Sequence, residues 1–155
     1  MRRTDKEITS LDQIHAIVRD CEVCRLGLAV DGEPYVVPVS FGFNGEAVFF
    51  HTARQGKKID MMTANPRICI QFERNVKLVT DDDDACSWTF HFESVIGFGS
   101  VTELVGEAEK ARGLNRIMQH YSGRDWSFGG PHMSATRVWR VDLDILTGKR
   151  SETKG

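Results

Sequence analysis

Apolar and polar residues alternate through most of the middle of the chain, which is the period of a β-strand with one apolar face. Every odd position from Tyr35 to Phe43 is apolar, and so are the even positions 88, 90, 92, 96 and 98. The same reading along the whole chain predicts six strands, at residues 24–30, 35–43, 46–53, 67–73, 88–104 and 136–146.

Three other segments have the period of an α-helix: residues 10–21, 56–64 and 106–121. Ser10 is placed to cap the first helix, and Asn44-Gly45 is a hairpin turn signal that makes the flanking strands antiparallel. Gly97 and Gly99 predict a bend or bulge in the long strand. Strands dominate, so we expect a mainly β fold: a six-stranded antiparallel barrel with flanking helices.

No repeat, linker or change of composition divides the chain, so we expect one domain over residues 1–155. Within it, residues 1–22 form an N-terminal helical segment, and residues 107–121 form a peripheral helix.

Composition narrows the classes of function. The net charge is −2, which argues against nucleic acid as a partner, and no apolar run approaches the ~20 residues that span a bilayer. The basic residues near the N-terminus are not followed by the apolar segment of a secretory signal. We therefore predict that the protein is cytoplasmic and does not bind a membrane. Cys21 and Cys24 form a single C-x2-C without a second half-site, which favours reduced, mostly buried thiols over a metal site.

The candidate chemistry lies in "FFHTARQGKKID", where a buried strand ends at His51 and Thr52 and a helix begins near Lys57 and Lys58. Lysines at a helix start are unfavourable for the helix dipole. Two ammonium groups beside unpaired backbone N–H groups are, however, a suitable site for a phosphate, with the Thr52 hydroxyl as a further donor. The alternative is a solvated basic turn that binds nothing.

Residues 24–104 resemble the pyridoxamine 5′-phosphate oxidase-related flavin-binding split barrels, and most of all the 5-nitroimidazole resistance proteins. The segments "GEPYVVPVSFG", "FFHTARQGKKID" and "SVIGFG" carry the resemblance. It implies an FMN-binding split barrel that forms a homodimer, with FMN, or in some relatives FAD, at the interface between the subunits.

The resemblance also implies which residues hold the flavin. It places the backbone of Val39, Ser40 and Phe41 along the ring edge, and the phosphate on Lys57 and Lys58. The remaining implied contacts are His51, Thr52 and Ala53 beside the flavin, with Ser94 and Val95 closing around the ribityl chain or ring. His51 matches a histidine implicated in the chemistry of the resistance proteins, which makes it the candidate catalytic residue. The alternative is a histidine that only binds or packs beside the cofactor.

The C-terminal arginines do not match the substrate-phosphate site of true pyridoxamine-phosphate oxidases, so that reaction is not assigned. The expected function is reduction of a small electrophile, such as a nitroaromatic, by an FMN flavoprotein with electrons from NAD(P)H. Two alternatives remain open: a flavin carrier or sensor without turnover, and a haem-binding split barrel.

Overall fold

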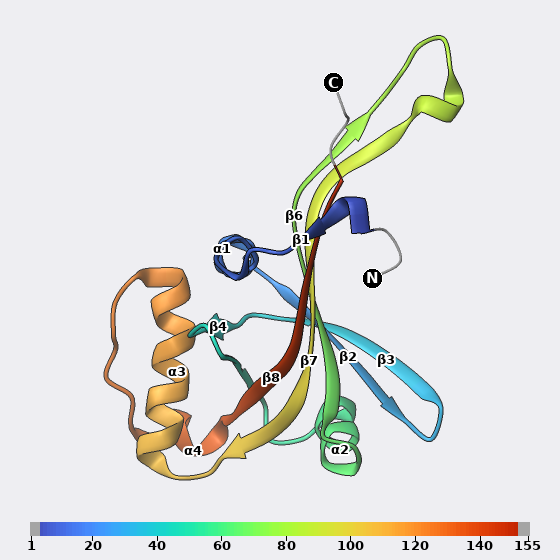
Figure 1. Ribbon diagram of the computed structural model, residues 1–155. Coiled ribbons are helices and arrows are strands. Elements are labelled where there is room, and N and C mark those ends of the chain that lie inside the picture. Colours follow the sequence, from blue (N-terminus) through green and yellow to red (C-terminus); the bar gives the residue numbers. More distant parts are fainter. Residues whose placement is uncertain (1–3, 152–155) are drawn as a thin grey trace.

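The order of the strands explains why the sheet curls (Figure 1). The computed structural model describes residues 4–151, and within them eight strands form one antiparallel sheet. Its order is β3-β2-β6-β7-β8-β5-β4, with β1 paired to β8. Only Ser40 and Phe41 separate β3 at one end of this order from β4 at the other. The sheet therefore has to curl until its two ends meet, and it forms a split barrel.

The predicted fold class is confirmed, and the six predicted strands are the six longer ones. The strands are β1 (Glu7–Ile8), β2 (Cys24–Val30), β3 (Glu33–Val39), β4 (Gly42–Phe43), β5 (Ala47–Thr52), β6 (Arg67–Val79), β7 (Thr89–Leu104) and β8 (Arg137–Ser151). The structure adds β4, because the predicted strand at 35–43 breaks at Ser40 and Phe41, and it adds β1, which lies within residues 1–22, the segment predicted as helical. Residues 1–3 and 152–155 of the predicted domain lie outside the described residues.

The predicted bulge in the long strand is present between Phe98 and Gly99. A Cβ atom on Gly99 would lie 2.2 Å from the carbonyl oxygen of Asp142 on β8, so only glycine permits this approach. The bulge bends β7 across the barrel, as a strongly coiled sheet requires.

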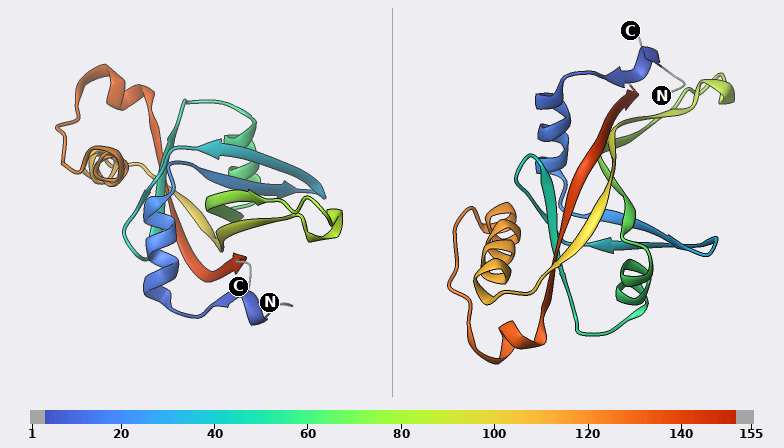
Figure 2. Two further views of the ribbon diagram at one scale, coloured as in Figure 1. Left: turned by 90° about the horizontal axis from the view of Figure 1, so that it is seen from above. Right: turned by 60° about the horizontal axis from the view of Figure 1, so that its bottom comes forward.

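Four α-helices lie around the sheet within residues 4–151 (Figure 2). They are α1 (Leu11–Asp20), α2 (Lys57–Ala64), α3 (Glu107–Ser122) and α4 (Gly130–Ala135), with 3-10 turns η1 (Thr4–Lys6) and η2 (Ala85–Ser87). The Ser10 side chain caps α1 by accepting a hydrogen bond from the N–H of Gln13 at 3.4 Å, as predicted. α4 was not predicted. None of the described helices is long and apolar enough to cross a membrane.

Two apolar cores hold these layers together. The barrel interior is filled by side chains from most strands, among them the fully buried Leu26, Phe41, Phe50, Ile70 and Phe72. The buried residues Ile14, Ile17 and Val18 of α1 join this core. A smaller core of Ala47, Phe49 and Ile117 packs α3 against the opposite side of β5.

The apolar face of β7 points away from the barrel. Its odd residues Glu93, Val95 and Val101 are buried, while its even residues include Phe90, Ile96 and Phe98, which are 50%, 40% and 38% exposed. Leu78 of β6 lies opposite Phe90, and Ile145 of β8 lies opposite Phe98, so both share this face. We call these five residues the outer apolar stripe: Leu78, Phe90, Ile96, Phe98 and Ile145. Part of the stripe lies on the β6–β7 hairpin, which projects beyond the rest of the sheet (Figure 1).

Candidate functional site

The first group of predicted site residues meets where the curled sheet closes. β4 pairs with β5 through Gly42 and Phe49, so the residues just before Gly42 run past the last residues of β5. This closure brings the predicted segment Val39–Phe41 next to the predicted segment His51–Ala53. We call this junction the barrel seam.

Two of the predicted seam residues already have internal partners. The Thr52 hydroxyl accepts a hydrogen bond from Nε1 of the buried Trp139 at 3.0 Å and donates one to the Ala53 carbonyl at 2.8 Å. The Phe41 N–H donates to the Tyr121 hydroxyl at 3.0 Å, and the Phe41 ring is fully buried. Of the segment Val39–Phe41, Ser40 is the exposed residue. A ligand at the seam would therefore meet Ser40 and the remaining carbonyl groups rather than the Phe41 N–H.

Tyr121 and Trp139 support the seam but were missed as site residues. Tyr121, on the last turn of α3, accepts from Phe41 and donates from its hydroxyl to the Glu22 carbonyl at 2.6 Å. Trp139 stacks on Phe50 with ring centroids 6.5 Å apart. These contacts join residues about 80 to 100 positions apart in the sequence, and no local pattern marks them.

His51 and Lys58 are close enough for their charges to interact. His51 lies on β5, with its side chain on the α3 side of the sheet. Partial burial lowers the pKa of His51 below its ordinary 6.5, and the positive charge of Lys58 lowers it further. The imidazole is therefore neutral at pH 7, and it offers one N–H donor and one acceptor nitrogen.

The start of α2 keeps its helix-end donors uncapped. Gly56, with φ of 144°, precedes the helix and has no side chain to cap it, and its carbonyl accepts from the Ile59 N–H at 2.8 Å, so the N–H groups of Lys57 and Lys58 are the donors left without a side-chain cap. Those donors and the Lys58 ammonium group together form a positive site beside His51.

Lys57 is directed elsewhere. Its ammonium group lies 4.0 Å from a Glu33 carboxylate oxygen and 4.9 Å from the centre of the Tyr35 ring, both on β3. Within one chain, Lys58 is therefore the lysine that faces the predicted catalytic histidine, and Lys57 would have to turn to reach the same anion.

Val95 and Ser94 lie differently relative to the seam in the same chain. Val95 pairs with Phe72, whose ring centroid lies 5.2 Å from that of Phe41, whereas Ser94 is remote from Thr52. Thr52 pairs with Arg137 near the beginning of β8, whereas Ser94 pairs with Lys149 near its end. At ~3.3 Å per residue, about 40 Å of strand separates these two positions. Val95 is fully buried, and Ser94 is half-buried on the same face of β7 as the outer apolar stripe. One chain therefore brings Val95 close to Phe41, whereas Ser94 lies on the outer face of the sheet, away from Thr52.

The C-x2-C pair is part of the core. Cys21 donates from its thiol to the carbonyl groups of Ile17 and Glu73, and burial raises the pKa of Cys24 to about 12. Among residues 4–151, no three His, Cys, Asp or Glu side chains are grouped as metal ligands are.

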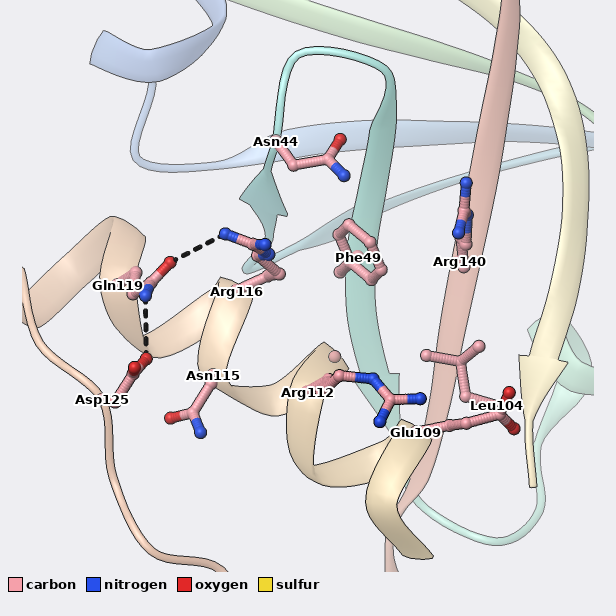
Figure 3. A pocket seen from close by; sticks show the side chains of 11 residues that line it. Asn44, Phe49, Leu104, Glu109, Arg112, Asn115, Arg116, Gln119, Asp125 and Arg140 are labelled. Carbon is pink, nitrogen blue, oxygen red and sulfur yellow. Dashed lines mark hydrogen bonds between the residues drawn. The ribbon is translucent and has the colours of Figure 1, made fainter. Parts of the chain in front are cut away.

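Two cavities flank α3. The first, of about 360 Å³, lies over Phe49 and is lined by charged side chains from α3 and β8 (Figure 3). Arg116 donates to Gln119, which in turn donates to Asp125, so much of its polar lining is already paired. It contains no predicted site residue.

The second cavity, of about 260 Å³, has His51 in its wall. We call it the α3–α4 pocket. Its other lining residues are Leu114, Ile117 and Met118 of α3, and Phe128, Gly129, His132, Met133 and Thr136 of the segment around α4. None of these was predicted as a site residue. The α3 residues are apolar positions of a predicted amphipathic helix, and α4 is short, contains glycine and proline, and gives no periodic signal.

Comparisons with known proteins agree with this arrangement. The sequence model of the family described as pyridoxamine 5′-phosphate oxidase matches residues 10–150. A crystal structure of a candidate 5-nitroimidazole antibiotic resistance protein from Bacteroides thetaiotaomicron is 32% identical. The match covers 94% of this chain and 90% of that one, with a TM-score of 0.82.

More distant structures share the fold. The flavocytochrome Anf3 from Azotobacter vinelandii has a TM-score of 0.83 at 20% identity, over 98% of this chain and 72% of that one. A FAD-binding protein from Mesorhizobium loti has a TM-score of 0.69 at 21% identity, over 95% and 98% of the two chains.

An uncharacterised protein of Rhizobium meliloti is 28% identical over 64 residues, which are 41% of this chain and 42% of that relative. The family model and the Bacteroides structure, in contrast, extend over nearly the whole chain. The chain therefore belongs to the family of pyridoxamine 5′-phosphate oxidase-related split-barrel proteins.

Proposed function

We propose that the protein is a homodimeric flavoprotein that binds FMN at the barrel seam and reduces a small electrophile, such as a nitroaromatic, with electrons from NAD(P)H. Two observations carry this proposal: β4 pairs with β5, which directs Ser40 toward the end of β5, and the charge of Lys58, at the start of α2, acts on His51. Relatives described as FAD-binding support a flavin as the ligand. FMN rather than FAD is inferred from the sequence resemblance.

The residues present fit a flavin phosphate. Helix-end N–H groups and an ammonium group both favour a dianion, and Gly56 leaves its approach to the start of α2 open, since no atom would contact a Cβ there. A bound flavin would supply two-electron transfer between a nicotinamide and an acceptor. The chain would supply binding, orientation and a neutral His51 that donates a hydrogen bond to the acceptor.

A second copy of the chain is part of this proposal for two reasons. Ser94, which the resemblance places at the flavin, lies on the outer face of β7 and pairs near the opposite end of β8 from Thr52, so we infer that a partner provides it. Ser94 also lies on the face of β7 that carries the outer apolar stripe, which is larger than scattered surface residues explain. A partner that covers the stripe would place its own Ser94 in the interface between the subunits. A cytoplasmic location stays a prediction.

The first test is the visible spectrum of the purified protein with excess FMN, before and after gel filtration. We expect flavin absorbance to stay with the protein. The double variant Lys57→Ala/Lys58→Ala should bind FMN about tenfold or more weakly, because it removes two positive charges from the phosphate. The control Arg112→Ala/Arg124→Ala removes two charges near α3 and should bind FMN normally. Equal affinity in both double variants would exclude the phosphate site, and a haem Soret band in place of flavin would favour the haem alternative.

The second test separates catalysis from binding at His51. His51→Ala should retain FMN, while NAD(P)H-dependent reduction of a nitroaromatic should fall about 100-fold, because a positioned hydrogen-bond donor that stabilises developing negative charge contributes about that much. A rate equal to that of the unchanged protein would remove His51 from the mechanism. Flavin binding without turnover of any acceptor by the unchanged protein would favour the carrier or sensor alternative.

A further inference from the structure

The α3–α4 pocket has the size of a small organic molecule. Its volume is about 260 Å³. For comparison, an engineered apolar cavity of ~150 Å³ accommodates benzene. One ring with a few substituents therefore fits, whereas a flavin or a nicotinamide nucleotide does not. The pocket is thus distinct from a cofactor site, although it shares His51 with the barrel seam.

The walls of the pocket select against charge. Leu114, Ile117, Met118, Phe128 and Met133 provide carbon and sulfur surfaces, and the pocket lining includes no Lys, Arg, Asp or Glu. A charged group held against these apolar side chains would lose its hydration without gaining a counter-charge from them, which is unfavourable. Flexible methionine side chains and the Phe128 ring, in contrast, suit the faces of an aromatic ring.

Few polar groups remain for a ligand. The Thr136 hydroxyl already donates to the His132 carbonyl at 2.9 Å. The imidazoles of His51, from β5, and His132, from α4, are left to bind a polar substituent. Burial and Lys58 both favour the neutral form of His51, so its ring offers a polar substituent one N–H donor and one acceptor nitrogen.

We propose that the α3–α4 pocket binds the electron acceptor and selects uncharged, single-ring aromatic molecules, with a polar substituent directed to His51. This inference rests on the proposed function, which supplies the idea that the bound molecule is the electron acceptor. It adds the place where the acceptor binds and the prediction that charged acceptors bind weakly. Met118, Phe128 and Met133 are the residues that set this selectivity.

A matched pair of acceptors tests the selectivity. para-Nitrobenzamide and para-nitrobenzoate have nearly the same shape and differ in one negative charge. The FMN-loaded protein should show a KM for the benzoate about tenfold or more above that for the benzamide, because the carboxylate would be buried without a partner.

A variant that changes which of the two acceptors is preferred gives a clearer result than a variant that only lowers activity. Unfolding lowers activity, but it cannot change the ratio of the two KM values. Met118→Lys places one positive charge in the pocket and should shift the ratio of the two KM values about tenfold toward the benzoate. Gln119→Lys adds the same charge one residue later, where the side chain lines the other cavity. Its ratio should stay within about twofold of the unchanged protein.

Binding is also measured without turnover. In the protein without FMN, para-nitrobenzamide should shift the NMR signals of the His51 and His132 rings, and not those of His15. Such shifts together with absent turnover would support the pocket and contradict the proposed function. Turnover with an unchanged preference in Met118→Lys and with unshifted histidine signals would overturn the pocket and leave the proposed function intact.

Discussion

The protonation of His51 depends on two neighbouring influences of different origin. Partial burial of the ring removes water that would solvate an imidazolium, and the Lys58 ammonium group repels its positive charge. The folded-state pKa is therefore lower than that of an exposed histidine. Since the unfolded chain then takes up this proton more readily, the stability linked to His51 is complete above pH ~6.5 and is lost as the pH falls through the folded pKa.

Lys58→Gln should raise the pKa of His51 toward its ordinary value, because one of the two lowering influences is removed. An NMR titration of the ring protons measures the change directly. Lys57→Gln is the matched control, since Lys57 lies against Glu33 and Tyr35. A His51 pKa that is the same in both variants would show that Lys58 does not act on the ring.

Three strands are joined by one buried carboxylate at the base of the projecting β6–β7 hairpin. Glu93 of β7 is 7% exposed and accepts from Arg74 and Asn75 of β6 and from Arg150 of β8, at 2.7–2.9 Å. Burial alone would raise the pKa of Glu93, but the hydrogen bonds and charges of the two arginines outweigh it and lower the pKa.

Glu93→Gln should reduce the free energy of unfolding by about 3 kcal/mol, the lower end of the range for a buried pair, since both arginines are partly exposed. Urea denaturation near pH 7 measures the loss. Asp144→Asn removes an exposed carboxylate that pairs with Arg67, and it should cost less than about 1 kcal/mol. Equal losses in the two variants would mean that Glu93 does not fasten the hairpin.

Local patterns predicted most elements but not how they pack. The predicted start and end of β5, α2 and α3 lie within one residue of the observed bounds, because strand and helix periods and turn residues act locally. The two faces of β7 were visible from its period, but periodicity does not say which face is inside. The residues on the inner face of β7 have to be small where β7 passes β8, because a Cβ atom on Gly99 would lie 2.2 Å from the Asp142 carbonyl oxygen. That constraint comes from β8 and cannot be read from β7.

The same limit applies to the candidate site. The resemblance pointed to His51 and Lys58, which are separated by a single turn. The Thr52–Trp139 and Phe41–Tyr121 hydrogen bonds depend on how distant segments meet, and the α3–α4 pocket depends on a helix without a periodic signal.

At the scale of the whole molecule, the outer apolar stripe should decide the oligomeric state. Phe98→Asp places a charge in the stripe and removes a large apolar contact worth roughly 2 kcal/mol, so the proposed dimer should dissociate at micromolar concentration. Sedimentation velocity measures the state. FMN affinity should fall in parallel, because the partner would no longer provide Ser94.

Val105→Asp is the control for this change. Val105 is 78% exposed and lies outside the stripe, after the end of β7, so the dimer should persist. An unchanged protein that sediments as a monomer at all concentrations, with FMN bound, would contradict the proposed interface.

The three tryptophans occupy three different surroundings, and together they make the protein its own fluorescence probe. Trp139 is 4% exposed and bonded to Thr52 at the seam, whereas Trp88 on the projecting hairpin and Trp126 after α3 are 51% and 42% exposed. The short-wavelength side of the emission spectrum therefore comes mainly from Trp139. A flavin bound at the seam would quench the emission of Trp139 by energy transfer. The red side includes Trp88, whose emission would shift to the blue once a second subunit covers the hairpin. A single titration of unlabelled protein can thus follow cofactor binding and subunit association as separate signals.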